Sequence, residues 1–187
     1  MIVGVPRESF PGERRVALVP SALAVLTKAG MEVVVEAGAG AEAGYPDAEY
    51  VAKGAKIIPQ RSEVFRVADI IVQVLAHGAN DRTGSSDLSL FHRDQILVGF
   101  LRPLGDVTSV TDLASRGVTS FSVELVPRTT RAQSMDALSS MSTVAGYKAV
   151  SYTHLDVYKR QVPDDFVTVE REHLKTREQL GNSVTDV

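Results

Sequence analysis

Short apolar runs rich in Val and Ile alternate, over the first 150 residues, with segments in which apolar residues recur at helical spacing. A repeated change between strand and helix periods is typical of βα units. Strands are expected at residues 2–5, 32–36, 55–58, 70–75, 96–101 and 118–123. Such continuously apolar runs suit a sheet that is covered on both faces. We therefore predict a parallel, doubly wound α/β sheet.

Capping residues and glycines mark the helices expected between these strands. The first helix should follow a cap at Ser21, and its apolar face is expected to hold Ala22, Val25, Leu26 and Ala29 before Gly30 ends it. Further helices are expected at 47–53, 62–68 and 107–116, and the last from about 133 to 150.

Two of these expectations are more specific. Asp106 should cap the helix that carries Val107, Val110 and Leu113 inward and ends at Gly117. A polar loop is expected at 78–87.

No G-x-G-x-x-G sequence follows any predicted strand. The glycine clusters at 37–44 and 77–84 lie in turns after strands, but they lack this spacing. The sheet is therefore expected to be flavodoxin-like or Rossmann-like without the glycine fingerprint that binds a dinucleotide.

Length and composition limit the remaining possibilities. A chain of 187 residues with 44% hydrophobic residues can form one domain with a tail. Its net charge of -3 gives no basic field for nucleic acid, and no apolar run reaches the roughly 20 residues of a membrane span. The absence of cysteine excludes disulfides and thiolate metal sites. We expect a cytoplasmic chain.

The character of the chain changes at Ser151. The run SYTHLDVYKRQ, residues 151–161, breaks the small-residue pattern before it and resembles the translated adaptor remnants found at the ends of reading frames assembled from metagenomic reads. The rest is strongly charged, with a weak helical pattern near 169–180. We therefore divide the chain into a domain at 1–150 and a non-native or disordered tail at 151–187.

The richest chemistry lies in VPRTTRAQSMDALSSMSTVAGYKAV, residues 126–150. On the expected helix, Gln133, Asp136 and Ser139 would share a polar stripe. The opposite stripe should be buried and would hold Leu138, Met141, Ala145 and Ala149. A nicotinamide carboxamide needs a donor and an acceptor, and its phosphates suit a guanidinium. From spacing alone, an ordinary surface ion pair between Asp136 and Arg128 or Arg131 is the favoured interpretation.

The string PRTTRAQSMDALSSMSTVAGYKAV resembles a pattern of NAD(P) transhydrogenase alpha subunits, where it precedes the nucleotide-binding domain. The stretches MIVGVPRE, GERRVALVPSALAVLTKAG and VEAGAGAEAGYPDAEYVAKGA resemble the start shared by these subunits and alanine dehydrogenases. The resemblance covers about residues 1–150 and implies a truncated N-terminal domain. It also implies a set of residues at the nicotinamide end of NAD: Arg128, Thr129, Thr130, Arg131, Gln133, Ser134, Asp136 and Ser139.

The same resemblance implies that Arg15 corresponds to an arginine that holds the substrate carboxylate in alanine dehydrogenases. Those enzymes also need a lysine and a histidine where this chain has Leu75 and Arg102. Leucine cannot transfer a proton and arginine stays protonated, so this departure argues against amino-acid oxidation. His77 and His92 are expected to be solvated surface residues without a role.

The family resemblance implies hydride transfer between NAD(H) on this component and NADP(H) on a partner domain, coupled to proton translocation by a membrane subunit. It further implies a homodimer held at the inner membrane only through its partner subunits. Two alternatives remain open, namely a fragment of an alanine-type NAD-dependent dehydrogenase and a non-catalytic α/β dimerisation or binding module.

Overall fold

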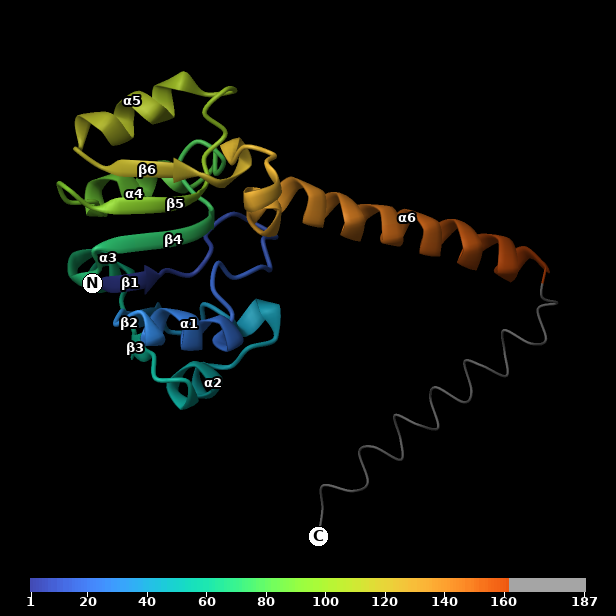
Figure 1. The fold of residues 1–187 in the computed structure, drawn as a ribbon, viewed down its shortest axis with the longest axis horizontal. Helices are drawn as coiled ribbons and strands as arrows, with labels where there is room; N and C mark the ends of the chain where they lie inside the picture. Colours follow the sequence, from blue (N-terminus) through green and yellow to red (C-terminus); the bar gives the residue numbers. More distant parts are fainter. Residues whose placement is uncertain (162–187) are drawn as a thin grey trace, which may run out of the picture. The chain divides into compact units, whose positions relative to one another are not determined.

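The computed structural model of the chain describes the backbone of residues 1–161 and the side chains of residues 1–133 and 135–151. The described residues divide into two units, of which the first is Met1–Ala137 and the second begins at Leu138. The first unit holds the whole sheet (Figure 1). The weak helical pattern near 169–180 lies outside the described residues.

Six parallel strands form one sheet in the order β3-β2-β1-β4-β5-β6. This is the strand order of doubly wound dinucleotide-binding folds. The strands are β1 (Ile2–Val5), β2 (Glu32–Glu36), β3 (Lys56–Ile58), β4 (Ile70–Leu75), β5 (Ile96–Phe100) and β6 (Thr119–Ser122). The predicted parallel α/β sheet is confirmed, and every strand lies within the residues predicted for it.

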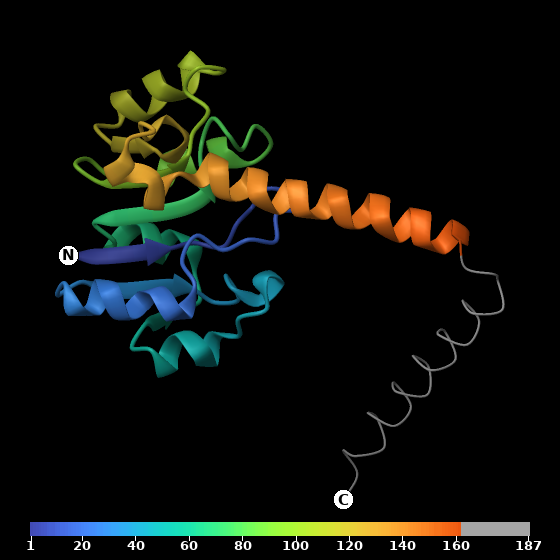
Figure 2. The same cartoon turned by 45° about the vertical axis from the view of Figure 1, so that its right-hand side comes forward.

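Helices cover both faces of this sheet (Figures 1 and 2). One face carries α1 (Leu23–Lys28) and α2 (Asp47–Ala52), and the other carries α3 (Arg61–Val67), α4 (Gly84–Asp87) and α5 (Val107–Ser115). Short 3-10 turns join them: η1 (Pro20–Ala22), η2 (Ala41–Ala43), η3 (Leu88–Leu90), η4 (Val123–Leu125) and η5 (Thr130–Met135).

Alternation along the central strands supplies a core on each face. Val33 and Val35 of β2 pack on the α1 and α2 side, whereas Val34 packs on the α3 side. In β1, Gly4 faces α3, and a Cβ there would lie 2.7 Å from the Cβ of Ala68. Helix α3 can therefore lie directly against the central strand only because residue 4 has no side chain.

The start of the first helix differs from its prediction. Ser21 makes no capping bond and lies inside η1, which carries Pro20 at its first position. Val25 is 71% exposed, and the buried residue of α1 is Leu23. Pro20 fixes the chain in a 3-10 turn first, which moves the helix start and rotates the face that meets the sheet. The predicted end at Gly30 is confirmed by its φ of +76°.

Helix α5 has the predicted cap but a different buried face. The Asp106 carboxylate accepts from the backbone N–H groups of Thr108 and Ser109, at 3.1 and 3.4 Å. Leu113 is buried as expected, but Ser109 takes the other inward place because its hydroxyl donates to the Asp106 carbonyl. Val107 and Val110 were expected inward and are 71% and 40% exposed. The predicted polar loop at 78–87 contains the helical turn α4.

The last helix, α6 (Ala137–Gln161), begins four residues later than predicted, because the 3-10 turn η5 occupies residues 130–135. It continues without a break past Ser151. The predicted buried stripe is wrong for the described residues, since Leu138 and Met141 are 43% and 45% exposed and Ala145 and Ala149 are exposed too. The described part of the second unit is this single helix, which has no second surface of its own to bury a stripe.

The cap of α5 gives a direct test of local stability. Asp106→Ala should lower the free energy of unfolding by about 1 kcal/mol, because two N–H groups lose their acceptor. Asp106→Asn should cost much less, since the amide oxygen can accept the same bonds. Urea denaturation of both variants measures the difference, and equal losses would show that the carboxylate does not act as a cap.

Candidate functional site

The strand order changes direction between β1 and β4. These strands pair directly, with Val3 opposite Ile70 and Gly4 opposite Ile71, but the chain continues to opposite sides of the sheet from each. In doubly wound sheets ligands bind in the crevice outside the carboxyl ends of the strands at this switch point. The loops at 6–19 and 76–83 border it.

Glu8, which follows β1, fills part of this crevice. Its two carboxylate oxygens accept from the backbone N–H groups of Val74 and Leu75, at 2.6 and 3.1 Å. These N–H groups belong to the part of β4 that extends beyond β1 and would otherwise have no partner there. Burial raises the pKa of Glu8 above its ordinary value, although the two N–H bonds act in the opposite direction.

A second set of polar groups ties the two loops together. The Asn80 side-chain amide donates to the hydroxyls of Ser9 and Thr83, at 3.0 and 2.9 Å. The Asn80 side-chain oxygen in turn accepts from the Thr83 N–H at 2.9 Å. Asn80 is 2% exposed, so this network lies inside the crevice.

Arg61 of α3 forms the third polar group. Its guanidinium binds both oxygens of buried Asp87 at 2.7 and 2.6 Å and reaches Glu36 of β2 at 3.1 Å. Gln73 of β4 donates to the same Asp87 carboxylate at 3.1 Å. The protein's own side chains therefore occupy part of the switch point. A cavity of about 450 Å³ remains beside them, and it is lined by Arg7, Glu8, Ser9, Phe10, Gly12, Glu13, Arg14, Arg15, Ala39 and Glu42.

A second, apolar cavity of about 450 Å³ lies close to these side chains. Its walls come from β4, β5 and the loop before α1. They are formed by Arg15, Val16, Ala17, Val19, Ala43, Val72, Gln73, Val74, Val98, Gly99, Phe100 and Val123. Arg15 brings the one charged group of this lining, and its guanidinium is held by Glu13 through a 2.8 Å and a 2.6 Å contact. The bond to Arg15 lowers the pKa of Glu13.

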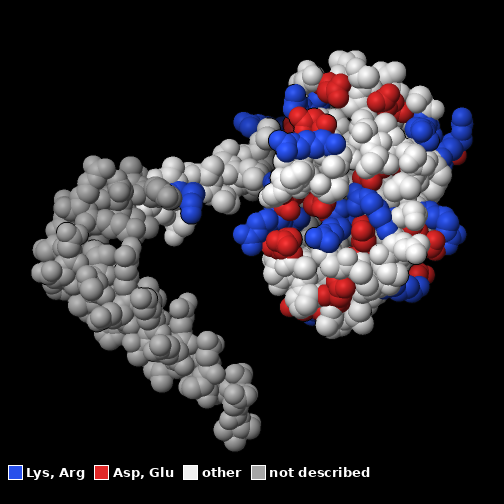
Figure 3. All heavy atoms as spheres, turned by 180° about the vertical axis from the view of Figure 1, so that it is seen from behind, with Lys and Arg blue, Asp and Glu red and all other residues white. Residues whose placement is uncertain are grey.

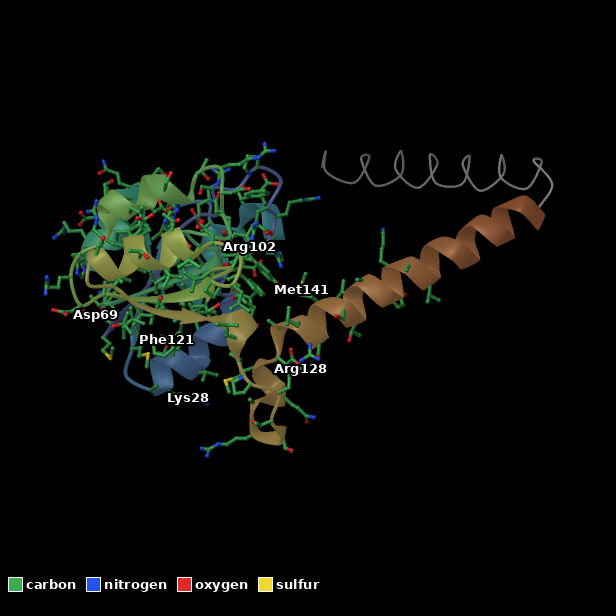
Figure 4. The ribbon with its side chains drawn as sticks, turned by 90° about the horizontal axis from the view of Figure 1, so that it is seen from above. Lys28, Asp69, Arg102, Phe121, Arg128 and Met141 are labelled. Atoms are coloured by element: carbon green, nitrogen blue, oxygen red, sulfur yellow. The ribbon has the colours of Figure 1, made fainter. Side chains whose placement is uncertain are left out.

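Leu75 and Arg102 lie where the sequence placed them, at the ends of β4 and β5. The backbone N–H of Arg102 and that of Leu101 both donate to the Glu124 carboxylate. Arg102 has a φ of +53°, a left-handed conformation that is uncommon for a residue other than glycine. Its side chain is exposed (Figure 4). Neither residue places a titratable proton donor or acceptor at the end of its strand.

The predicted cofactor-binding residues lie in η5 and the turns around it. Arg128, Thr129, Thr130, Arg131 and Gln133 have exposed side chains. The structure brings Arg128 and Asp136 together, with Nε 3.7 Å from Oδ2, and Asp136 is only 13% exposed. The surface ion pair that spacing left open is therefore present.

Two other predicted residues cannot be joined to this pair. The side chain of Ser134 lies outside the described residues, and Ser139 belongs to the first turn of α6 in the second unit. Gln133 and Asp136 precede α6, so the predicted helical stripe of Gln133, Asp136 and Ser139 does not form.

His77 differs from its prediction as a surface residue. Its side chain is 10% exposed and its Nε2 lies 3.1 Å from Oδ2 of Asp112 on α5. It follows β4 closely, and the packing of α5 over that loop buries it. His92 is exposed, as predicted.

Lys, Arg, Asp and Glu are interspersed over the face of the first unit shown in Figure 3. Within residues 1–161, no helix is both long and apolar enough to cross a membrane. The described side chains contain no group of three or more His, Asp or Glu placed to hold a metal ion.

The sequence matches the family model "Alanine dehydrogenase/PNT, N-terminal domain" over residues 4–145. The chain belongs to this family. It is 39% identical over 150 residues to "NAD(P) transhydrogenase subunit alpha" of Cereibacter sphaeroides, a match that covers 80% of this chain and 28% of the relative. The crystal structure of transhydrogenase from Sinorhizobium meliloti matches with a TM-score of 0.73 and 37% identity, over 80% of this chain and 43% of that one.

Alanine dehydrogenases of the same family match as well. That of Methanococcus maripaludis is 33% identical over 150 residues, which cover 80% of this chain and 38% of the relative. The chain thus spans between about a quarter and two fifths of the length of these curated relatives. The resemblance to transhydrogenase alpha subunits seen in the sequence is confirmed.

Glu8 and Glu124 were not singled out from the sequence. Each is a single acidic residue near a strand end, and nothing in its local pattern distinguishes it from a solvated surface carboxylate. Only the pairing of β1 with β4 and of β5 with β6 shows which N–H groups need an acceptor.

The raised pKa of Glu8 predicts how stability depends on pH. Because the folded state holds this proton more tightly than the unfolded state, the contribution of Glu8 is present below its ordinary pKa of 4.5 and is lost as pH rises through the raised value. The unfolding free energy of the chain relative to Glu8→Gln should therefore fall between acid and neutral pH.

Glu63→Gln is the matched control. The side-chain bond from Arg66 lowers the pKa of Glu63, so the contribution of Glu63 is lost as pH falls. Denaturation at several pH values should give opposite slopes for the two comparisons. Parallel slopes would show that Glu8 is not held as a buried acid.

Proposed function

We propose that this chain is part of the NAD(H)-binding component of a transhydrogenase, which exchanges hydride between NAD(H) and NADP(H). The observation that carries the proposal is the pair Leu75 and Arg102 at the ends of β4 and β5. Amino-acid oxidation needs proton transfer there, and neither side chain can accept or donate a proton near neutral pH. Two transhydrogenase alpha subunits, at 39% and 40% identity, are more similar to this chain than the alanine dehydrogenases at 33%, which supports the same choice, although another alpha subunit is also 33% identical.

Hydride transfer between two nicotinamides fits such a site. The reaction needs two rings held face to face at near-attack distance with water excluded, and the cofactors themselves supply the chemistry. The protein has only to bind and orient the rings. A site without a catalytic acid or base is then sufficient.

The residues that would orient the NAD ring lie at 128–139, in η5 and on either side of it. The Arg128 and Asp136 side chains already lie together, which places a donor and an acceptor side by side before α6. In the proposed site the Asp136 carboxylate accepts from the nicotinamide carboxamide and the Arg128 guanidinium faces a phosphate. Thr129, Thr130, Arg131, Gln133, Ser134 and Ser139 complete the proposed set.

Affinity for the dinucleotide must come mainly from elsewhere in the protein. Glu8, Asn80 and Arg61 occupy part of the switch point of this sheet, and no G-x-G-x-x-G turn follows β1. The first unit would therefore form one wall of a cleft, and a nucleotide-binding domain would supply the other. On this proposal the present chain alone is inactive.

The names of the relatives call them subunits, which supports further subunits as partners. By the family resemblance these would be NADP-binding and membrane subunits, and proton translocation would be coupled through them. We propose a cytoplasmic component, held at the inner membrane through these partners and present as a homodimer.

We also propose that the family domain ends near residue 150 and that residues 151–187 are foreign to it. The family model reaches residue 145, and the matches to the curated relatives extend over 144 to 150 residues. Helix α6 nevertheless continues through Ser151, because the following residues have adequate helix propensity.

The proposal is tested in a chimera. Residues 1–150 replace the matching 150 residues of the Cereibacter sphaeroides subunit alpha, and NADH-dependent reduction of an NADP analogue is measured with its NADP-binding partner. Transfer at a rate within about tenfold of the unaltered subunit is expected, because the site residues are supplied by the exchanged part. NADH binding without transfer, together with alanine-dependent NAD reduction, would favour the dehydrogenase. NADH binding with neither activity would favour the non-catalytic module.

In the same chimera, Arg128→Gln and Asp136→Asn test the ring-orienting site. Each should slow hydride transfer by on the order of a hundredfold, while the dissociation constant of NADH changes only a few-fold. The exposed Arg116 on the far end of α5 provides the control substitution Arg116→Gln, which should change neither quantity. An unchanged transfer rate in both site variants would contradict the assignment.

A further inference from the structure

One carboxylate connects the end of β5 to the turn that follows β6. Glu124 lies in η4, and its Oε1 accepts from the backbone N–H of Leu101 at 3.0 Å and from that of Arg102. Both N–H groups lie beyond the last residue of β5, where the ladder with β6 has ended. Because N–H groups at a buried strand end need an acceptor, these bonds hold η4 against the end of β5.

The Glu124 carboxylate is a strong acceptor because it is ionised. Burial alone would raise the pKa of Glu124, but the bonds that its carboxylate accepts, those from Leu101 and Arg102 included, lower it below its ordinary value. Bonds to an ionised acceptor are stronger than bonds to a neutral one. The φ of Arg102 is +53°, which is unfavourable for a residue with a side chain, and the bond to Glu124 offsets part of this strain.

The stretch that follows Glu124 has little burial to hold it in place. Residues 125–131 contain no buried side chain. The next buried residue is Ala132 in η5, which is 6% exposed, and Asp136 follows at 13%. We define residues 126–136 as the site segment. Its position therefore depends on Glu124 before it and on η5 within it.

Little freedom remains between η4 and Arg128, which is labelled in Figure 4. The Val126 N–H donates to the Val123 carbonyl at 3.3 Å, and the Thr129 N–H donates to the Pro127 carbonyl at 2.9 Å. The proline ring fixes its own φ and restricts the residue before it. A displacement of η4 would therefore be passed on to Arg128 and not absorbed on the way.

We propose that Glu124 positions Arg128 and Asp136 by anchoring the site segment to the end of β5. The inference rests on the proposed function, because it concerns the residues that would orient the NAD ring. In this role Glu124 touches no cofactor and acts through the backbone that it holds. Orientation of the ring determines the rate of hydride transfer more than it determines affinity. Loss of Glu124 should therefore slow the transfer and leave NADH binding nearly unchanged.

Trypsin tests the anchor without reference to any activity. In the full chain, cleavage after Arg128 and Arg131 requires local opening of the site segment, and its rate follows the population of the open form. Glu124→Ala should speed both cuts at least about tenfold relative to the cut after Arg116 at the end of α5. Mass spectrometry of the fragments measures this cleavage ratio.

Two further variants separate anchoring from a general loss of stability. Glu124→Gln keeps an oxygen that can accept both N–H bonds, so its cleavage ratio should stay within about threefold of that of the parent chain. Glu8→Ala removes a carboxylate that also accepts from two strand-end N–H groups, on the neighbouring β4, and should leave the ratio unchanged. An unchanged ratio in Glu124→Ala, or an equal rise in Glu8→Ala, would overturn the proposal.

The chimera with the Cereibacter sphaeroides subunit alpha measures the effect on the reaction. Glu124→Ala should slow hydride transfer at least about tenfold and change the dissociation constant of NADH at most about threefold, and Glu124→Gln should recover most of the rate. In an Asp136→Asn background, Glu124→Ala should slow transfer much less, because both substitutions act on the same orientation.

Equal slowing in both backgrounds would overturn the positioning role. A chimera that transfers no hydride at all, even without these substitutions, would instead contradict the proposed function. The cleavage ratio would then still decide whether Glu124 anchors the site segment.

Discussion

The carboxyl edge of this sheet depends on one constraint: backbone N–H groups beyond the ends of the paired strands need acceptors. Parallel strands of unequal length leave such groups without a ladder partner, and burying them unpaired would cost about 1–3 kcal/mol each. Glu8 accepts from two of them on β4, Glu124 accepts from two after β5, and Glu36 accepts from the Arg7 N–H after β1. The carboxyl edge of the sheet is held by carboxylates that the chain itself provides.

The carboxylates at this edge also limit what the switch point can bind. A carboxylate at the switch point repels the phosphates that a doubly wound sheet of this strand order commonly binds there. The polar network of Asn80 and Arg61 occupies a further part of the crevice. No glycine fingerprint follows β1, so the proposed nucleotide site would lie at the periphery of the domain. Arg128 and Asp136 lie on either side of η5, away from the switch point. This position agrees with the proposed role as one wall of a cleft.

The sequence predicted the strands well because each is a short β-branched run bounded by polar turn residues, and a buried parallel strand has few other compatible patterns. It failed where the outcome depends on partners distant in sequence. Ser21 can cap a helix, but Pro20 begins a 3-10 turn that absorbs it. The burial of His77 depends on Asp112 of α5. For the candidate site, family motifs supplied the residues, whereas spacing supplied only the Arg128 and Asp136 ion pair. Spacing could not show that residues 130–135 form a 3-10 turn before the helix, because a 3-10 turn and the first turns of an α-helix are compatible with the same polar residues.

The apolar residues of α5 that were predicted inward but are exposed are more informative than the strands that were predicted correctly. When apolar residues of a helix are predicted to face inward but are exposed, there are two explanations. Either the helix is predicted wrongly, or the residues face a surface that is not part of the unit. Here the helix itself is present and capped as predicted, and Leu113 in the same row is buried. The error is therefore not in the helix. Val107 and Val110 therefore continue a correctly predicted row, and the first unit does not contain the surface against which this part of the row would pack.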